Sequence, residues 1–557
     1  MIVDGFQATS SIYDNSHSSL AHNWSPGKKL YVVSTGLFIN FNTCLSAALP
    51  TGALETLTAA FNVTSQEQKA LPVAVFLIGY IFGPLIFGPM GESYGRKICF
   101  LFSFGLYTIF TLACAVAPNW PLFLLFRFLV GVGASAPQYI LGGMYSDIYP
   151  NLLHRGKAMM MAGLMNSFGP LIGPIIAGYT STTNWHWMFW IALILATSNW
   201  PLLLFLPETF APVIIHRLQK TQEHRLVQPT AGKNMKDLVT IAFTRPIKMF
   251  AEPLVLFSDL FLVYQYSIYY LYFEAYQIIF QGPYGMTLGQ VALLLLPIGV
   301  GGIIAMFIFL WYDHFLSQSK LSGKEWAMRE EYRRLPLACV GGPLYTISLF
   351  WLGWTARPSI HWSVPALSGI VFGIGIDLTF MALNNYITDA YDIYSASALA
   401  SSVLSRNIAA ALLVPLATYQ MYDALGVAWA CSLLGFVCLA LSPIPFVFIK
   451  YGPVLRKRSK FCQAIERRES LTCRYTTQPP TSSQPTSAQP SFSLTQTIFI
   501  LARESRERNE ELEEQFKRYQ SNEEHWNTSF TDASGSIVDS GTAASGLREV
   551  FQKAAIS

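Results

Sequence analysis

The sequence has few charged residues for its length. Only 13% of its 557 residues are Asp, Glu, Lys or Arg, and 52% are hydrophobic, whereas roughly a quarter of a soluble domain is charged. The last 107 residues hold 14 of the 37 Lys and Arg residues and 13 of the 33 Asp and Glu residues. Residues 1–450 are too apolar to form a hydrated surface. This excludes a soluble multidomain protein and indicates that residues 1–450 are embedded in a membrane.

Patterns typical of several other protein classes are missing. The eight cysteines form no CxxC pair and lie in apolar segments or the C-terminal tail, so neither a disulfide framework nor a metal site is predicted. No Walker A, HExxH or GxSxG sequence occurs in the apolar segments, and we expect neither an enzyme nor a protein with a cofactor. The basic residues lie in loops between apolar runs and give no indication of nucleic-acid binding. The polar N-terminus lacks the apolar region of a cleaved signal peptide.

Apolar runs with a helical pattern predict an all-α integral membrane protein. A spanning helix needs ~20 mostly apolar residues, and the strand alternation of a membrane barrel is absent. The predicted spans are twelve in number and lie near 30–49, 72–90, 98–117, 121–144, 158–179, 187–206, 251–276, 288–312, 335–356, 362–384, 399–420 and 427–449.

The spans divide into two sets of six. We predict a cytosolic tail over 1–29, a six-helix bundle over 30–206, a central cytosolic loop over 207–250, a second six-helix bundle over 251–450 and a cytosolic, largely unstructured tail over 451–557. The fourth span ends in Ser146-Asp147-Ile148-Tyr149 and the tenth in Thr388-Asp389-Ala390-Tyr391. This short match indicates an internal duplication, so we expect two pseudo-symmetric bundles with a binding site near the midplane between them.

Basic residues fall on alternate loops, which predicts the orientation. One set of loops carries Lys28, Lys29, Arg96, Lys97, Arg155, Lys157, the basic 207–250 segment, Lys320, Lys324, Arg329, Arg333, Arg334, Arg456, Lys457, Arg458 and Lys460. The other set carries only Lys69 and Arg357. Because Lys and Arg favour cytoplasmic loops, both termini are expected in the cytosol. Asn62-Val63-Thr64 then lies in the first external loop as a candidate glycosylation site, although Asn23-Trp-Ser and Asn527-Thr-Ser also match.

Several motifs together carry a family resemblance. They are Gly88-Pro-Met-Gly-Glu92-Ser-Tyr-Gly95-Arg96-Lys97, Arg127-x-x-x-Gly131-x-Gly133, Gly169-Pro170-x-x-Gly173-Pro174-x-x-x-Gly178, Pro207-Glu-Thr-Phe-Ala-Pro-Val, Tyr272-Phe-Glu-Ala-Tyr and Glu331-Tyr-Arg-Arg-Leu-Pro. Over about residues 28–460 the chain resembles the major facilitator superfamily, and within it the fungal twelve-span drug:proton antiporter family. The resemblance implies export of small organic molecules in exchange for protons.

The loop between the second and third spans is a candidate gating latch. Gly88 and Gly95 permit a tight turn and close helix approach. Glu92 and Arg96, with Lys97 beside them, can form a charged latch at the cytosolic mouth, and Asp147 is a second acidic partner. Such a latch would break when the halves rock apart. The alternative is that these basic residues only set the orientation. The superfamily usually has Arg where this chain has Ser93.

Three intramembrane charges are candidates for proton coupling. A charge at the depth of Arg127 costs about 2.5–3.5 kcal/mol, so it should face a partner or a water-filled cavity, unless it reaches the interface. By resemblance it assists proton transfer. Asp259 and Asp377 are the carboxylates deepest in their spans, where burial disfavours their charged form. The alternative is that each is satisfied by a neighbouring polar group.

The substrate cavity is predicted from side chains of the second half. Tyr266, Tyr270 and Phe273 share a helical face with Asp259, and a carboxylate beside aromatic rings suits an amphipathic or cationic organic molecule. Glu274 is expected near the external mouth. Arg406 could pair with Asp389 or Asp392, or face the cavity with Asn407.

The glycines and prolines of the fifth span are similar to an antiporter motif. Gly169, Gly173 and Gly178 keep one face bare for close packing, and Pro170 and Pro174 kink the helix. By resemblance this face blocks leakage, whereas ordinary enrichment of Gly and Pro in spanning helices is the alternative.

The function predicted from these patterns is proton-coupled export of a drug, toxin or secondary metabolite by a monomer in the lipid bilayer. The plasma membrane is the expected location, with the vacuolar membrane as an alternative. A proton-coupled polyamine or nutrient transporter is the rival within transport, and a non-transporting membrane sensor is the rival outside it.

Overall fold

A computed structural model of the chain describes residues 20–182, 184–215, 244–391, 395–459 and 461–463. Within these ranges the regular structure is helical and contains no strand. Eleven helices of the described part are long and apolar enough to cross a membrane, and the shorter apolar helix Ser397–Leu413 lies where the eleventh span is predicted. The predicted all-α membrane fold is therefore confirmed. Most of the predicted tail over 451–557, and residues 216–243 of the central loop, lie outside the described residues.

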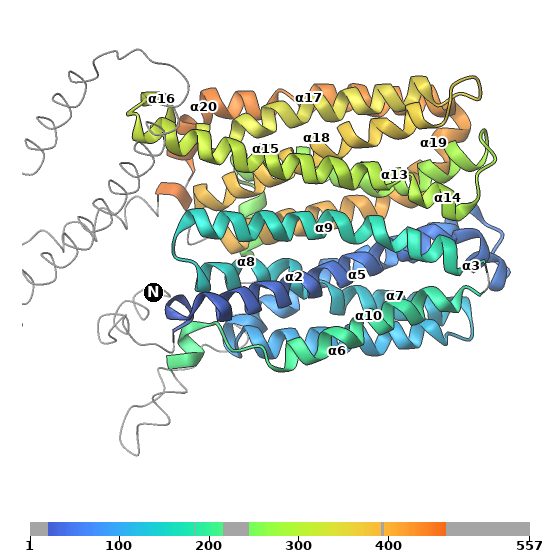
Figure 1. Cartoon of the computed structure of the whole chain (residues 1–557), viewed down its shortest axis with the longest axis horizontal. Helices are drawn as coiled ribbons and strands as arrows, with labels where there is room; N and C mark the ends of the chain where they lie inside the picture. Colours follow the sequence, from blue (N-terminus) through green and yellow to red (C-terminus); the bar gives the residue numbers. More distant parts are fainter. Residues whose placement is uncertain (1–19, 183, 216–243, 392–394, 460, 464–557) are drawn as a thin grey trace, which may run out of the picture. The chain divides into compact units, whose positions relative to one another are not determined.

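The helices of the first half lie mainly below those of the second half in the view of Figure 1. Along the first half run η1 (Ala21–Asn23), α2 (Pro26–Ala48), η2 (Leu49–Ala53), α3 (Leu54–Ala60), α4 (Gln66–Lys69), α5 (Leu71–Ser93), α6 (Arg96–Ala115), α7 (Trp120–Ala134), α8 (Ala136–Ile148), α9 (Leu152–Thr180) and α10 (His186–Leu204). The predicted fourth span ends too early at residue 144, because the helix continues to Ile148 and is divided near Ser135 into α7 and α8.

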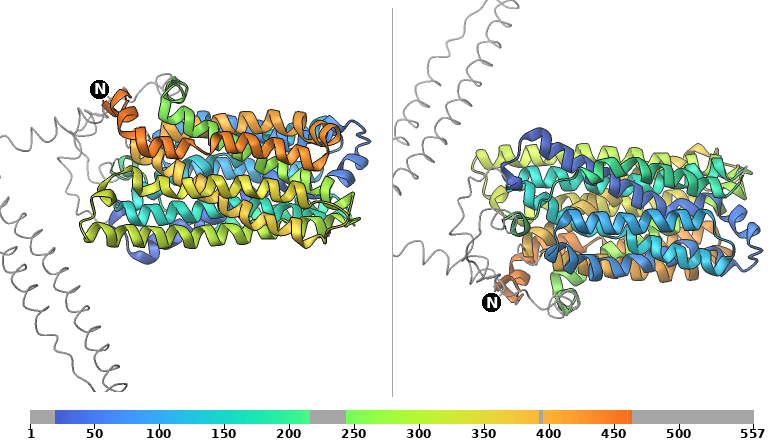
Figure 2. Two further views of the ribbon diagram at one scale, coloured as in Figure 1. Left: turned by 90° about the horizontal axis from the view of Figure 1, so that it is seen from above. Right: turned by 90° about the horizontal axis from the view of Figure 1, so that it is seen from below.

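The second half repeats this arrangement. Its elements are α13 (Pro253–Tyr276), the π-helix η3 (Gln277–Gln281), α14 (Leu288–Leu293), α15 (Leu296–Leu321), α16 (Glu325–Met328), α17 (Glu331–Thr355), α18 (Ser363–Tyr391), α19 (Ser395–Leu441) and α20 (Ile444–Arg458). The element α19 consists of two consecutive helices, which meet at a kink at Gly426, where φ is 70°. The long helices run along a common direction in both views of Figure 2.

Glycines bring equivalent pairs of helices together in the two halves. A Cβ on Gly131 of α7 would lie 2.2 Å from the carbonyl oxygen of Phe76 on α5, and a Cβ on Gly301 of α15 would lie 2.2 Å from that of Ile370 on α18. The second and fourth spans, and the eighth and tenth, therefore pack backbone to backbone, as small residues allow between membrane helices. This repetition supports the predicted duplication.

Several pairs of helices join the halves, which close at one end. α5 packs against α19, and α9 packs against α15. At what we call the closed end, Gln277 donates a hydrogen bond to the Thr51 carbonyl, and Gln281 Nε2 donates one to Glu55 Oε2 at 3.2 Å. The opposite end, which carries Arg96 and Arg334, is called the open end because the cavity described below reaches it.

Candidate functional site

A cavity of about 370 Å³ lies between the two halves. It begins at the open end beside Arg96 and Arg155, and reaches mid-helix positions at Gln138, Asn166 and Arg406. A volume of this size is typical of a site for a small organic molecule. The position between the halves agrees with the binding site that the predicted duplication implies.

Polar side chains from both halves meet at the inner part of this cavity. Arg406 Nη2 donates a hydrogen bond to Gln138 Oε1 at 3.0 Å, and Gln138 Nε2 donates to Asn166 Oδ1 at 3.1 Å. The Arg406 guanidinium also lies 5.1 Å from the ring centroid of Tyr266 and 5.0 Å from that of Phe380. Of the alternatives for Arg406, the cavity position is thus the observed one.

Asn407 does not line the cavity with Arg406. It is fully buried, and its side-chain oxygen accepts a hydrogen bond from the Tyr266 hydroxyl at 3.2 Å. Its Nδ2 donates to the Val403 carbonyl of its own helix. Asn407 therefore fixes the orientation of Tyr266.

Asp377 links the two halves beside a smaller, neighbouring cavity. Its Oδ1 accepts a hydrogen bond from the Ser167 hydroxyl, which joins α18 of the second half to α9 of the first. Tyr269 of α13 donates to the Ser167 carbonyl at 2.7 Å, and Gly302 of α15 leaves room for the other carboxylate oxygen. Asp377 is only 4% exposed and lines the smaller cavity, so a titratable carboxylate lies where the halves must separate.

Asp259 occupies a different environment. It is fully buried and faces Ser401, Ser402 and Ser405 of α19, with Arg406 close enough to interact electrostatically. Asp259 lines neither the larger cavity nor the smaller one beside Asp377. Its helical face is shared with Tyr266 as predicted, but its carboxylate lies against α19.

The aromatic face of α13 is present and buried. The ring centroids of Tyr266 and Tyr270 are 5.1 Å apart, and those of Tyr270 and Phe273 are 6.1 Å apart. Tyr266 and Tyr270 line the smaller cavity together with Tyr269. Glu274 is only 2% exposed, so it is more enclosed than a residue at an open external mouth.

Arg127 is held by backbone rather than by a carboxylate. It is fully buried, and it donates hydrogen bonds to the carbonyl oxygens of Pro72, Ser46 and Ala47 at 3.1, 3.0 and 3.3 Å. Its guanidinium lies 4.6 Å from the ring centroid of Phe76. Arg127 thus ties α7 to α2 and α5 from within the first half, and its side chain is enclosed by protein.

The bare face of the fifth span packs closely against both halves. A Cβ on Gly169 would lie 2.8 Å from the Leu45 backbone nitrogen, and one on Gly173 would lie 2.6 Å from the Leu45 carbonyl oxygen. Gly178 faces the backbone of Gly289 in the second half. Pro170 and Pro174 lie inside α9, and Pro174 packs against η2.

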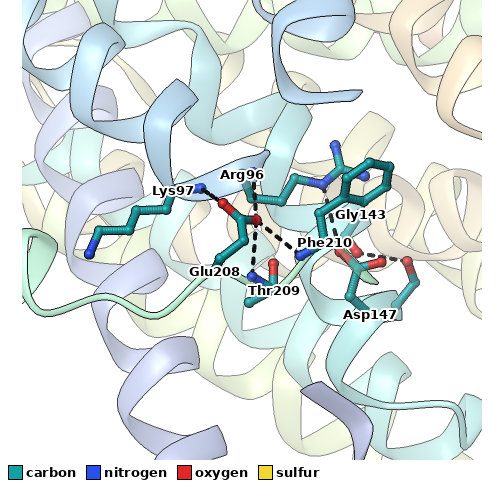
Figure 3. Close-up of polar contacts among 8 residues, drawn as sticks. Arg96, Lys97, Gly143, Asp147, Glu208, Thr209 and Phe210 are labelled. Carbon is teal, nitrogen blue, oxygen red and sulfur yellow. Dashed lines mark hydrogen bonds and ion pairs between the residues drawn. The ribbon is translucent and has the colours of Figure 1, made fainter. Parts of the chain in front are cut away.

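The candidate latch contains an ion pair within the first half. Arg96 Nε lies 3.7 Å from Asp147 Oδ2, which joins the start of α6 to the end of α8 (Figure 3). The Arg96 guanidinium also lies 5.0 Å from the Phe210 ring centroid. Gly88 faces the Tyr139 ring. The side chain of Glu92 lies outside the described residues, so its part in the latch remains a prediction.

The carboxylate of Glu208, for which the sequence predicts no role, clamps the same loop. Glu208 is 7% exposed, and its Oε1 accepts hydrogen bonds from the backbone N–H groups of Arg96, Thr209 and Phe210 at 2.8, 3.1 and 3.0 Å. Its Oε2 accepts one from the N–H of Lys97 at 3.2 Å (Figure 3). Glu208 therefore caps the N-terminus of α6, where a helix favours a negative charge.

An equivalent ion pair lies in the second half. Asp389 Oδ2 is 3.5 Å from Arg334 Nε and 3.9 Å from Arg333 Nε. Asp389 ends the tenth span and Arg334 begins the ninth, just as Asp147 ends the fourth span and Arg96 begins the third. Asp389 thus pairs with Arg333 and Arg334 and not with Arg406, and Asp392 lies outside the described residues.

Sequence reasoning missed Gln138, Asn166, Ser167, Tyr269 and Glu208. Amides and hydroxyls within apolar spans are a weak signal, because most bond to their own helix. Glu208 belongs to the Pro-Glu-Thr segment noted in the sequence, but the sequence did not indicate its hydrogen-bond partners.

Comparisons with known proteins identify the family. Residues 36–413 match the sequence profile of the Major Facilitator Superfamily. The MFS transporter prlG of a fungal species (strain NRRL 50135) is 36% identical over 78% of this chain and 93% of its own. The efflux pump FUB11 of Gibberella moniliformis is 34% identical over 80% of this chain and 76% of its own.

Solved structures show the same fold. The proton:xylose symporter XylE bound to 6-bromo-6-deoxy-D-glucose gives a TM-score of 0.56 at 16% identity, and covers 77% of this chain and 96% of its own. XylE from E. coli in a partially occluded inward-open conformation gives a TM-score of 0.55 at 15% identity, over 76% of this chain and 98% of its own. With a profile matched over most of the bundle and relatives above 30% identity, the chain belongs to the major facilitator superfamily and is a secondary transporter.

Proposed function

We propose that this transporter exports small organic molecules across the plasma membrane in exchange for protons, with both termini in the cytosol. The observation that carries this proposal is the hydrogen bond between Ser167 and Asp377, which joins the two halves beside the cavity. Relatives named efflux pumps support the direction of transport. Because the two halves of one chain enclose the cavity, a monomer suffices.

Protonation of Asp377 provides a coupling step. A hydrogen bond to an ionised carboxylate is roughly twice as strong as one between neutral groups. Proton uptake by Asp377 therefore weakens its bond to Ser167 and favours separation of α9 from α18. Among the described neighbours of Asp377, the Tyr269 hydroxyl is a second titratable group, and it interacts electrostatically with the carboxylate.

The open end corresponds to the cytosolic side in this proposal. Basic residues of the described loops concentrate at that end, which favours the cytosol. The cavity then faces inward, ready to take up a substrate for export. The pairs Arg96–Asp147 and Arg334–Asp389 flank its mouth and are the groups expected to re-pair during the transition.

The charge of the cavity argues against a polyamine substrate. Four arginines line it, namely Arg96, Arg155, Arg334 and Arg406, and Asp389 is its acidic member among the described residues. A polycation entering such a cavity would be repelled. Of the transport alternatives, polyamine uptake is therefore disfavoured.

The test combines discovery of a substrate with a measurement of coupling. Gene deletion followed by a resistance panel and metabolite profiling of cells and medium identifies an exported compound. Its export should stop when a protonophore removes the gradient while cellular ATP is maintained. Asp377→Asn should flatten the dependence of export on external pH, whereas the exposed Asp423→Asn should not. Export that follows ATP, or an unchanged pH profile in Asp377→Asn, contradicts the proposal.

A further inference from the structure

Arg406 places a buried positive charge at the inner part of the cavity. The residue is 5% exposed and lines the cavity. A guanidinium carries a positive charge and offers only N–H donors. Of its nitrogen atoms, Nη2 bonds to the neutral amide of Gln138, and Nε has no hydrogen-bond acceptor among the described residues.

Among the side chains that the structure describes, no Asp or Glu forms an ion pair with Arg406. Asp259 interacts with Arg406 electrostatically but forms no ion pair with it; it faces the serines of α19 and does not line the cavity.

Two of the other arginines that line the cavity have carboxylate partners. Arg96 pairs with Asp147, and Arg334 pairs with Asp389. Arg406 lies deepest in the cavity, between the rings of Tyr266 and Phe380. A desolvated charge is costly unless it is paired, so a ligand that supplies an anion gains more here than at the mouth.

We propose that Arg406 binds the carboxylate of the transported molecule, and that the substrate class is therefore organic acids with an apolar body. A guanidinium offers parallel N–H groups that match a carboxylate, and Asn166 stands beside it on the opposite half. The rest of the molecule meets the apolar residues Leu141, Met159, Met381, Leu399 and Val403. This inference rests on the proposed transport function. Of the amphipathic or cationic molecules expected from the aromatic face of α13, it favours an amphipathic anion.

A carboxylate bound to Arg406 would also bridge the two halves. Arg406 belongs to the second half, while Gln138 and Asn166 belong to the first. A carboxylate inserted between Arg406 and Asn166 would take the place of the Arg406–Gln138 bond and hold both halves. The substrate thus acts on a contact that must rearrange between inward-facing and outward-facing states.

The test uses three aromatic probes that differ in charge but share one ring system. Naphthoate, naphthamide and naphthylmethylammonium are titrated into the full-length protein in nanodiscs of zwitterionic lipid at neutral pH. Naphthoate should bind about tenfold or more tightly than the neutral amide, since hydrogen bonds to charged groups are the stronger ones. The ammonium should bind most weakly, and inorganic phosphate should not displace naphthoate.

Two variants make the test specific. Arg406→Gln should abolish the preference for naphthoate over naphthamide. Gln138→Glu places a carboxylate at the atom that already contacts Arg406, so it should also abolish the preference while Arg406 remains. The charge-matched control is Arg329→Gln, because Arg329 is exposed and outside the cavity; it should bind all three probes as the wild type does.

The results separate this inference from the proposed function. A preference for naphthoate that survives in Gln138→Glu and Arg406→Gln, or equal binding or no binding of the three probes by the wild type, overturns the anionic subsite. If the subsite behaves as expected but export of an identified acid ignores the proton gradient, the proposed coupling is wrong and the subsite stands.

Discussion

The clamp formed by Glu208 offers a sharp test of how the first half is held together. One buried carboxylate accepts four backbone N–H groups, two from the start of α6 and two from its own segment. Glu208→Ala leaves all four donors without this acceptor. Glu208→Gln keeps one oxygen but loses the negative charge and turns an NH₂ group toward the N–H donors.

The expected loss can be estimated from these contacts. A hydrogen bond to a charged group contributes about 1.5–3 kcal/mol, and removal of a helix cap costs about 0.5–2 kcal/mol. Water can replace the acceptor for the less buried donors, so the four contributions do not add. We expect about 2–4 kcal/mol of destabilisation for Glu208→Ala and about half of that for Glu208→Gln.

Gly95 makes the same clamp testable from the opposite side. Its φ is 98°, and a Cβ would lie 2.4 Å from Glu208 Oε2. Gly95→Ala therefore combines an unfavourable backbone conformation with a steric clash. It should destabilise the protein as much as Glu208→Ala does, and the double variant should lose less than the sum because both changes break the same contact.

The assay is thermal unfolding of purified protein, followed by the loss of the monodisperse peak in size-exclusion chromatography. Glu325→Gln, at an exposed acidic residue in the first turn of α16, is the control and should unfold as the wild type does. Export at matched surface abundance is measured in parallel. Wild-type thermal stability in Glu208→Ala would refute the reasoning that this carboxylate holds α6 to the segment after the sixth span.

Three further variants test other sites. Arg127→Ala should abolish export and lower the midpoint of thermal unfolding, because it removes three hydrogen bonds to buried carbonyl groups, a loss of about 3 kcal/mol or more; export at the wild-type rate would contradict this. Asp259→Asn should shift the pH profile of export while the protein still folds, and an unchanged profile would make Asp259 structural. Asn62 is exposed with φ 56°, in the loop between α3 and α4. Glycosidase treatment should change the gel mobility of the wild type but not that of Asn62→Gln. If treatment leaves the mobility of the wild type unchanged, the sequon is not glycosylated.

Helix positions were predictable because hydrophobic length is a local property. The seventh span was expected over 251–276 and is Pro253–Tyr276, and the third was expected over 98–117 and is Arg96–Ala115. The pairing of Arg96 with Asp147 was also predictable, because both belong to motifs placed at the same end of adjacent spans. Some helices continue beyond the predicted end of the span, because hydropathy falls at polar residues before the helix ends. The tenth span was expected to end at residue 384, and its helix ends at Tyr391.

Side-chain partners between distant spans could not be predicted. Ser167 and Asp377 are 210 residues apart, and Arg406 and Gln138 are 268 residues apart. Each contact depends on the rotation of two helices about their axes and on the packing of one half against the other. Periodicity placed Asp259 and Tyr266 on one face of α13, but neighbouring helices divide that face, so Asp259 meets serines of α19 while Tyr266 meets Arg406.

The sequence by itself therefore determined the all-helical membrane fold and the end at which basic residues gather, and it predicted a division into two similar halves. These properties follow from the length of apolar runs, their repetition and the cost of placing charge in lipid. Only the tertiary structure decided that Arg127 binds backbone carbonyls, that Glu208 caps α6 and that Arg406 faces the cavity without a carboxylate partner among the described residues. The physical reason is that a buried polar group takes its properties from the atoms around it, and folding brings those atoms from other parts of the chain.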